Sequence, residues 1–278
     1  MSAQPFAERY GRWAAVTGAA RGMGAAFAAE AAGRGLAVLL VDRDEAPLLE
    51  RAEELRNEGA EVATLVLDLA DPDAGHRLLR AVTDVDVGLF VSNAAIPFVG
   101  TFLDQSLDAA LVQLDVNCRV PLVVVHALLP RLVARGRGGV VLLSSQSAMR
   151  GTALSAGYAA TKAWNLILAE SLWYELRDTG VDVLAVLPGP TRTPGFMASL
   201  PQTSLATANV MQPIEVAREA LDALGSAPSI VTGQANRDAE AFLATLDRAE
   251  SVKVMGDVMR ATYPPDRDAD PDVGFEQG

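Results

Sequence analysis

The feature that most constrains this chain is the regular alternation of short apolar runs with longer helical patterns. The runs read "WAAVTG", "AVLLVD", "EVATLVLDL", "VGLFVSNAA", "GGVVLLSS" and "VDVLAVLPG". Because they lack polar alternation, they predict strands that are covered on both faces. Strand, helix and strand at this spacing require right-handed crossovers and hence a parallel sheet. The pattern therefore predicts an α/β fold, a doubly wound parallel sheet with helices on both faces and ligands at the carboxyl ends of its strands.

Three segments lie outside this alternation. Residues 194–213 lack periodicity and are expected to form a long loop with little helix, of the kind that often covers a substrate. Residues 238–263 follow a last short strand, "SIVTG", and predict a C-terminal helical extension. The polar tail 264–278 is rich in Pro and Asp, which predicts disorder. Nothing else divides the chain, so we expect one domain over residues 1–263.

Charge and cysteine content exclude several classes of function. The net charge of −12 argues against binding a nucleic-acid backbone, which needs basic patches, and favours a small-molecule partner. A single cysteine, Cys118, excludes an internal disulfide, and with only His76 and His126 beside it no Cys/His metal cluster is expected. The N-terminus resembles no signal peptide, and no apolar run suggests a membrane span. We therefore expect a cytoplasmic protein that needs no metal.

The first strand ends in a glycine-rich turn, "TGAARGMG". Glycine lets the backbone turn sharply and approach a phosphate, and the helix that follows directs its free N–H groups and positive dipole end at the anion. A buried strand before the turn and a helix after it are the context that a dinucleotide loop requires. The predicted cofactor contacts in this loop are Gly18, Arg21, Gly22, Met23 and Gly24.

The second strand ends at Asp42, 24 residues after Gly18. An acidic residue at this place accepts hydrogen bonds from the adenosine ribose, and its charge repels a 2′-phosphate. Asp42 therefore favours NAD over NADP. Arg21 and Arg43 lie nearby in the sequence and leave open the alternative that they bind the 2′-phosphate of NADP.

The stretch "SAGYAATKAWN" puts Tyr158 one helical turn before Lys162, on the same helix face. Tyrosine is a poor base at neutral pH because its pKa is roughly 10. A neighbouring ammonium group and a positively charged oxidised nicotinamide would both favour the phenolate. The pair therefore predicts a catalytic acid/base, Tyr158, with Lys162 as its activator.

Together these motifs resemble the short-chain dehydrogenase/reductase family over about residues 10–235. "TGAARGMG" is similar to the family's T-G-x-x-x-G-x-G loop, "YAATK" to its Y-x-x-x-K motif and "LPGPTRTP" to its P-G segment. "SNAA" stands where the family usually has N-N-A-G, so Ser92 and Ala95 depart from that pattern. The resemblance implies a Rossmann-type NAD(P)-dependent oxidoreductase that acts on CH–OH groups.

The same resemblance implies the roles of further residues. Ser145 stands 13 residues before Tyr158, which is the family's spacing, so it is the catalytic choice over Ser144 and would hydrogen-bond the substrate oxygen. Lys162 would hold the nicotinamide ribose, and Asn117 would hold a water that relays protons from Lys162. Tyr158 and Lys162 also contact the cofactor. The other implied cofactor contacts are Asp68, Leu69, Asn93, Ala94, Pro188, Gly189, Thr191 and Thr193.

The substrate site should lie between the serine segment and the loop at 194–213. The expected contacts are Gln146, Ser147, Met149, Phe196 and Met197, with Leu200 and Met211 beside them. These mostly apolar side chains favour a largely apolar secondary alcohol or ketone, although they could instead pack on the sheet. We expect NAD-dependent interconversion of the two. The alternatives are an NADP-dependent ketoreductase of the same family or a dinucleotide-binding sensor without turnover.

Two apolar helices bear on assembly. Residues 107–135 read as one long helix, kinked or broken at Pro121, and 157–178 read as another. Members of the family that this chain resembles often pair such helices in homodimers or homotetramers, which is the expected state. Burial against the chain's own sheet is an equal explanation of the apolar pattern. The extension at 238–263 could cover the cleft, extend a subunit contact or cap the core.

Overall fold

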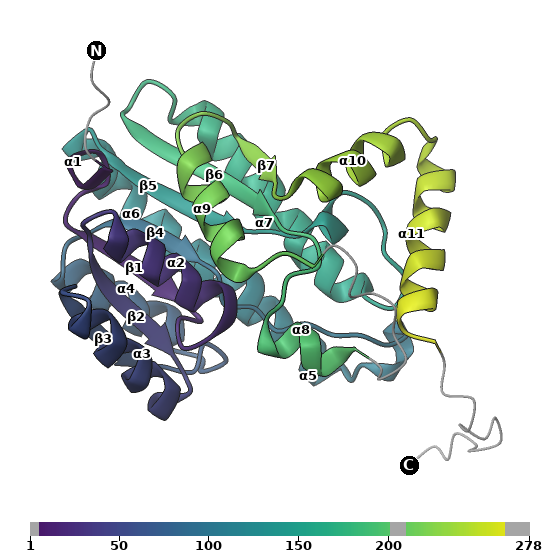
Figure 1. The fold of residues 1–278 in the computed structure, drawn as a ribbon, viewed down its shortest axis with the longest axis horizontal. Helices are drawn as coiled ribbons and strands as arrows, with labels where there is room; N and C mark the ends of the chain where they lie inside the picture. Colours follow the sequence, from purple (N-terminus) through teal and green to yellow (C-terminus); the bar gives the residue numbers. More distant parts are fainter. Residues whose placement is uncertain (1–5, 201–209, 265–278) are drawn as a thin grey trace.

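The computed structural model describes residues 6–200 and 210–264. In this part of the chain the apolar runs form one 7-stranded sheet in the order β3-β2-β1-β4-β5-β6-β7, with every neighbouring pair parallel (Figure 1). The strands are β1 (Trp13–Thr17), β2 (Ala37–Asp42), β3 (Val62–Val66), β4 (Val87–Ser92), β5 (Gly138–Leu143), β6 (Val181–Leu187) and β7 (Ser229–Val231). The predicted doubly wound parallel sheet is confirmed. Its order reverses between β1 and β4, where the carboxyl ends of such sheets form a crevice.

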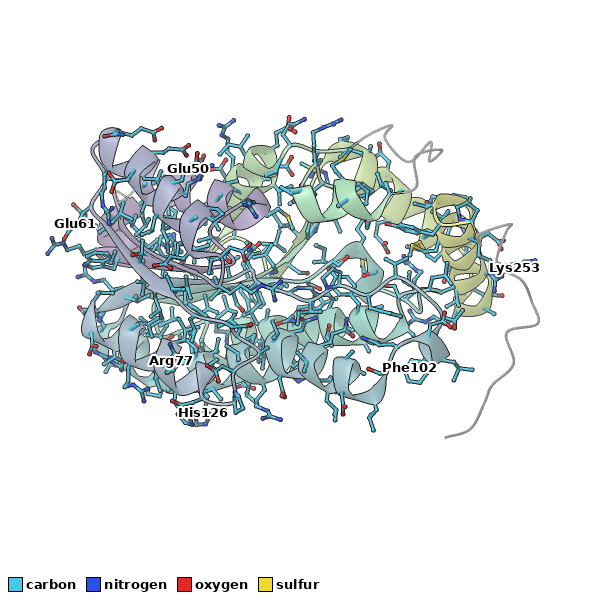
Figure 2. The ribbon with its side chains drawn as sticks, turned by 90° about the horizontal axis from the view of Figure 1, so that it is seen from below. Glu50, Glu61, Arg77, Phe102, His126 and Lys253 are labelled. Carbon is cyan, nitrogen blue, oxygen red and sulfur yellow. The ribbon has the colours of Figure 1, made fainter. Side chains whose placement is uncertain are left out.

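Helices cover both faces of the sheet, as predicted. They are α1 (Phe6–Tyr10), α2 (Gly22–Gly33), α3 (Glu45–Asn57), α4 (Ala74–Asp84), α5 (Leu107–Leu114), α6 (Val120–Arg135), α7 (Ala156–Glu175), α8 (Pro194–Ser199), α9 (Pro213–Ala223), α10 (Gln234–Leu243) and α11 (Arg248–Thr262). In Figure 2 Glu50 of α3 lies on one side of the sheet, and Arg77 of α4 and His126 of α6 lie on the other.

The side chains of the strands pack into two separate apolar cores, one on each face of the sheet. In β2, Val38 and Leu40 pack in the core under α2, α3 and α9, whereas Leu39 and Val41 pack in the core under α4, α6 and α7. All four side chains are buried. This arrangement explains why the strands show no polar alternation, since side chains on both faces of the sheet are buried away from water.

The long helix predicted over 107–135 is interrupted before Pro121. A π-helical turn, Asp115–Arg119, separates α5 from α6. Pro121 has no N–H to give to the carbonyl of Asn117 four residues earlier, and the side-chain amide of Asn165 donates to that carbonyl instead, at 3.0 Å. A side chain thus replaces the missing backbone donor at Asn117, a predicted site residue.

The same stretch, Leu107–Arg135, is long and apolar enough by length and composition to cross a membrane. In the structure 50% of its apolar window is buried inside the protein, as is typical of a helix that packs on a sheet.

The C-terminal extension differs from the sequence-based expectation of one helical segment. It consists of α10 and α11, and α11 begins at a capping box in which Asp247 and Glu250 each accept from the other's backbone N–H. The region 194–213 contains the short helix α8, and its residues 201–209 lie outside the described part. So does the tail predicted to be disordered, apart from Pro264.

Candidate active site

The glycine loop has the geometry of a phosphate cradle. Gly18 and Gly22 have φ angles of +67° and +60°, a backbone conformation that favours glycine. A Cβ on Gly24 would overlap the carbonyl oxygen of Gly18. Arg21, the N-cap of α2, makes no side-chain capping bond, so the first N–H groups of the helix stay free for an anion. The loop therefore fits the diphosphate of a dinucleotide.

Hydrogen bonds join the glycine loop to the end of β4 at the switch point of the sheet. The hydroxyl of Thr17 accepts from the backbone N–H groups of Asn93 at 3.0 Å and Ala94 at 3.1 Å. In return, the Asn93 amide donates to the Thr17 carbonyl at 2.8 Å. Asn93 and Ala94, both predicted from the sequence, thus form a rigid floor beside the loop.

Asp42 lies at the end of β2, beside the glycine loop. Its carboxylate accepts from the backbone N–H groups of Ala20 at 2.9 Å and Asp44 at 3.1 Å. Each oxygen keeps a lone pair for a further donor, such as a ribose hydroxyl. The guanidinium groups of Arg21 and Arg43 both pair with the Asp44 carboxylate, at N···O distances of 3.4 and 4.0 Å.

After β3, Asp68 is exposed and accepts from the N–H of Ala70, while Leu69 is buried. These two residues therefore lie at the carboxyl end of β3, on the same edge of the sheet as Asp42.

The serine pair after β5 divides into one structural and one accessible hydroxyl. Ser144 is 2% exposed and donates to the carbonyl of Lys162 at 2.7 Å. Ser145 instead accepts from the backbone N–H of Ser147 at 3.2 Å and from its hydroxyl at 2.9 Å. Because both of these bonds end at the Ser145 oxygen, its own hydrogen remains to donate, and the Tyr158 phenol is its partner here. The geometry therefore favours Ser145 over Ser144.

Tyr158 and Lys162 lie together on α7, with the ammonium group of Lys162 over the ring of Tyr158. The ammonium nitrogen is 5.6 Å from the centre of the Tyr158 ring and donates to the carbonyl of Leu143 at 2.7 Å. Burial raises the pKa of the Tyr158 phenol to about 12, and its hydrogen bond with Ser145 offsets only part of this. Burial dominates this pKa and Lys162 is not among the groups that shift it, so the role of Lys162 as activator stays a prediction.

Lys162 itself is 3% exposed, which excludes a solvated surface lysine. Burial lowers the pKa of its ammonium group to about 8, and the Cys118 side chain opposes this shift. A lysine held in this way points its charge at the carboxyl end of β5 rather than at solvent.

The side-chain amide of Asn117 is hydrogen-bonded to groups within the protein. Its side chain accepts from the N–H of Ile96 at 2.8 Å and donates to the Ile96 carbonyl at 3.1 Å and to Thr161 at 3.0 Å. In the described part of the chain no hydrogen bond joins Asn117 to Lys162. Asn117 therefore braces the segment after β4 against α7, and its relay role stays a prediction. Thr161 and Asn165, which complete this bracing, carry no motif that would reveal them in the sequence.

The segment after β6 contacts both the serine turn and the glycine loop. The Pro188 carbonyl accepts from the N–H of Gln146 at 3.1 Å, and the Thr191 hydroxyl donates to the Gly189 carbonyl at 3.0 Å. Thr193 caps α8 by accepting from the N–H of Phe196, and its methyl group lies against Gly22. Gly22 and Thr193, two predicted cofactor residues far apart in the sequence, thus come together.

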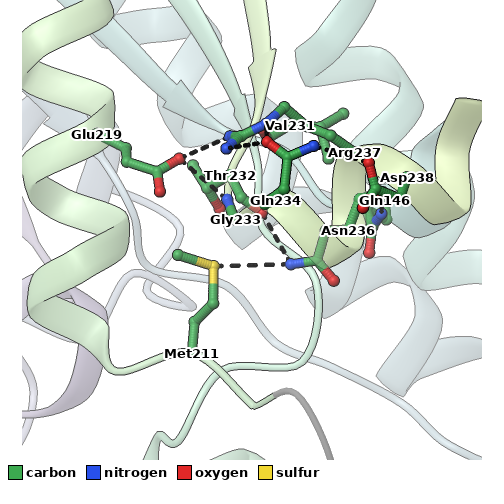
Figure 3. Close-up of polar contacts among 10 residues, drawn as sticks. All are labelled: Gln146, Met211, Glu219, Val231, Thr232, Gly233, Gln234, Asn236, Arg237 and Asp238. Carbon is green, nitrogen blue, oxygen red and sulfur yellow. Dashed lines mark hydrogen bonds and ion pairs between the residues drawn. The ribbon is translucent and has the colours of Figure 1, made fainter.

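The predicted substrate residues are only partly free to meet a ligand. The Gln146 amide donates to the carbonyl of Asn236 at 3.0 Å, and Met211 packs against the Asn236 amide at 3.6 Å (Figure 3). Met149 is partly buried against the core. Phe196 and Met197 on α8 stay partly exposed. In the described residues no group of His, Cys, Asp and Glu could hold a metal ion.

The comparisons agree with this geometry. The short chain dehydrogenase family matches residues 12–204. A 7beta-hydroxysteroid dehydrogenase from Clostridium sardiniense is 31% identical over 252 residues, 90% of this chain and 97% of that protein. A solved structure from work on 7beta-hydroxysteroid dehydrogenase stereoselectivity superposes with a TM-score of 0.84 at 28% identity, covering 91% of this chain and 99% of that one. A Sphingobium yanoikuyae short-chain dehydrogenase in complex with NADPH is 29% identical, with a TM-score of 0.73, covering 86% of this chain and 97% of that one.

The glycine loop follows β1, and Ser145 with its α7 neighbours Tyr158 and Lys162 lies at the end of β5, where a doubly wound sheet binds its ligands. This chain belongs to the short-chain dehydrogenase/reductase family, as its motifs implied. It is an NAD(P)-dependent enzyme that acts on CH–OH groups.

Proposed function

We propose that this enzyme interconverts a secondary alcohol and a ketone on a bulky, largely apolar skeleton, with Tyr158 as the general acid/base. The observation that carries the proposal is the grouping of Ser145, Tyr158 and Lys162 at the carboxyl end of β5, in the sheet whose β1 carries the glycine loop. The three residues favour an enzyme over a nucleotide-binding sensor, because a protein that only binds nucleotide needs no group that exchanges a proton with a substrate.

In the proposed reaction the phenol of Tyr158 exchanges a proton with the substrate oxygen. NAD(P), when bound, supplies or takes up the hydride. Because its pKa is raised to about 12, Tyr158 is protonated at neutral pH and ready to donate to a ketone oxygen. Ser145 donates a hydrogen bond to the same oxygen and stabilises its developing charge. For alcohol oxidation Lys162 must turn from the Leu143 carbonyl toward the phenol and ribose.

For the cofactor we infer a preference for NAD over NADP. The Asp42 carboxylate, fixed by two backbone N–H groups, would accept from the adenosine ribose hydroxyls and repel a 2′-phosphate. The NADPH complex of the Sphingobium relative favours the alternative, in which Arg21 and Arg43 leave Asp44 to bind that phosphate. Affinities for NADH and NADPH, measured by nucleotide fluorescence, separate the two.

For the substrate we infer a hydroxyl or oxo group on a polycyclic skeleton of steroid size. The names of the relatives from Clostridium sardiniense and Collinsella aerofaciens support this class. The partly exposed Phe196 and Met197 would give such a skeleton an apolar surface.

The test is a panel of substrates with the wild type and Tyr158→Phe. The panel contains 7β-hydroxysteroids, their 7α epimers, simple aliphatic alcohols and small polyols. We expect the hydroxysteroids to give the highest kcat/KM, and Tyr158→Phe to lose at least about a hundredfold in kcat while NADH still binds. Best turnover of small polyols would refute the substrate class, and an active phenylalanine variant would refute the mechanism.

For assembly and location we propose a cytoplasmic homodimer or homotetramer. Apolar side chains stay exposed on α5 and α7, including Leu107 at 73%, Ile167 at 60% and Tyr174 at 61%. A second copy of the chain would cover them. Light scattering tests this, because Ile167→Asp should shift the mass to the monomer.

A further inference from the structure

The turn that follows Ser145 is fastened to the C-terminal extension at three points. The side-chain amide of Gln146 donates to the carbonyl of Asn236 on α10 at 3.0 Å. The guanidinium of Arg248, the first residue of α11, donates to the carbonyl of Met149 at 2.9 Å. The third contact joins Arg150 to Glu240 of α10. A turn of five residues, 146–150, thus meets both helices of the extension.

The contact between Arg150 and Glu240 is a buried two-pronged ion pair. The two guanidinium nitrogens donate to the two carboxylate oxygens at 2.7 and 2.5 Å. The side chains are only 7% and 14% exposed. Parallel N–H···O bonds of this kind fix the relative orientation of both groups, and removal of one partner leaves a buried charge uncompensated. The ion pair therefore fixes the orientation of α10 relative to the turn, in addition to attracting the two segments to each other.

The fastened turn is the one that holds the Ser145 hydroxyl. Ser147, within the turn, gives Ser145 both of its donors, and the Thr152 hydroxyl donates to the carbonyls of Ser147 and Arg150 at 3.3 and 3.2 Å. A chain of contacts therefore runs from Glu240 through the turn to Ser145. The same helix reaches the segment after β6, because a Cβ on Gly189 would overlap the side chains of Asn236 and Gln146.

We propose that Arg150 and Glu240 are positioning residues that clamp the α10–α11 extension onto the turn and thereby hold Ser145 in place for catalysis. The inference rests on the proposed function, since it takes Ser145 as the group that meets the substrate oxygen. It assigns the extension a task in the chemistry of the site, besides any contact with substrate or a second subunit.

The test compares Glu240→Gln with Arg237→Gln in the full-length protein. Arg237 is the matched control because it lies on the same helix, lines the same surface hollow beside β7 and pairs with Glu219 at 2.9 Å, but does not contact the turn. Two readouts are needed: steady-state kinetics with NADH fluorescence, and hydrogen exchange of the segment 145–152. Exchange reports local opening directly and needs no turnover.

We expect Glu240→Gln to lower kcat about ten- to a hundredfold, because displacement of a catalytic group by about 1 Å has effects of this size. NADH affinity should stay within about twofold, and exchange at 145–152 should rise while the glycine loop is unchanged. Arg237→Gln should match the wild type in every readout. Arg248→Gln, a milder change at an exposed contact, should lower kcat about threefold and keeps the test valid if Glu240→Gln does not fold.

The proposal is overturned if exchange at 145–152 stays at the wild-type rate in Glu240→Gln, or if Arg237→Gln behaves like Glu240→Gln. A parallel loss of NADH affinity and kcat would also overturn it, because general damage to the fold has that effect. If the wild type converts no alcohol or ketone, the proposed function fails, and the exchange result still decides whether the clamp exists.

Discussion

Replacement of the buried Lys162 by methionine should make the protein more stable and less active. Lowering the pKa of an ammonium from 10.5 to about 8 corresponds to about 3 kcal/mol of unfavourable free energy at neutral pH. Methionine removes that cost, but it leaves the Leu143 carbonyl without the 2.7 Å hydrogen bond, which costs about 1–2 kcal/mol. The net gain in the free energy of unfolding at pH 7 is about 1–2 kcal/mol, or roughly 2–8 °C in the unfolding midpoint.

The sign of the pH dependence follows from the lowered pKa. Between about pH 8 and 10.5 the unfolded lysine keeps its proton while the native lysine loses it, so the unfolded state binds more protons. The wild type therefore gains stability as pH rises through this window. The Lys162→Met variant does not share this gain of about 3 kcal/mol, so its advantage at pH 7 should shrink, vanish near about pH 9 and reverse above it.

The assay is thermal and urea unfolding of both proteins in nucleotide-free buffer from pH 7 to pH 10, with kcat measured in parallel. Lys162→Gln, which also removes the charge but can donate a hydrogen bond, is the control and should be at least as stable as Lys162→Met. The reasoning is refuted if Lys162→Met is less stable than the wild type at pH 7, or if the difference between them does not change with pH.

Three further predictions concern the cofactor cradle and its support. Gly24→Ala should weaken NADH binding at least about tenfold, because its Cβ would overlap the Gly18 carbonyl; unchanged nucleotide fluorescence would contradict this. Asp42→Ser should shift the ratio of NADPH to NADH affinity at least about tenfold toward NADPH, since it removes the charge that repels the 2′-phosphate; an unchanged ratio would point to Arg21 or Arg43 instead. Asn117→Ala should lower the free energy of unfolding by about 2–3 kcal/mol, because the backbone groups of Ile96 lose their partners; a loss under about 0.5 kcal/mol in urea unfolding would refute the bracing role.

The fold could be predicted because its signals are local and repeated. Most strands are short apolar runs rich in Val, Leu or Ala, and the glycine and serine motifs follow such runs directly. In a parallel sheet the carboxyl ends of all strands meet at one edge, so motifs far apart in the sequence, such as Gly18 and Tyr158, had to come together. Periodicity and motif order therefore suffice for the architecture, and they predict that the site lies at this edge of the sheet.

The contacts that hold the site could not be predicted, because they join residues without local pattern. Arg150 and Glu240 are 90 positions apart, and nothing in either neighbourhood marks them as partners. The division of the extension at Asp247 was readable in principle from the capping box with Glu250, a signal that the helical periodicity obscured. The pKa of Tyr158 depends on burial and on its hydrogen bond with Ser145, and neither follows from sequence spacing.

The two apolar cores on opposite faces of the sheet have a consequence for the evolution and engineering of this enzyme. Leu128 of α6 lies in one core and Leu221 of α9 in the other, and backbone strands separate them. Changes at such positions share no neighbours, so their effects on stability should add. Substitutions can therefore accumulate on one face while the other stays intact, and each layer of helices can be redesigned on its own against an unchanged sheet.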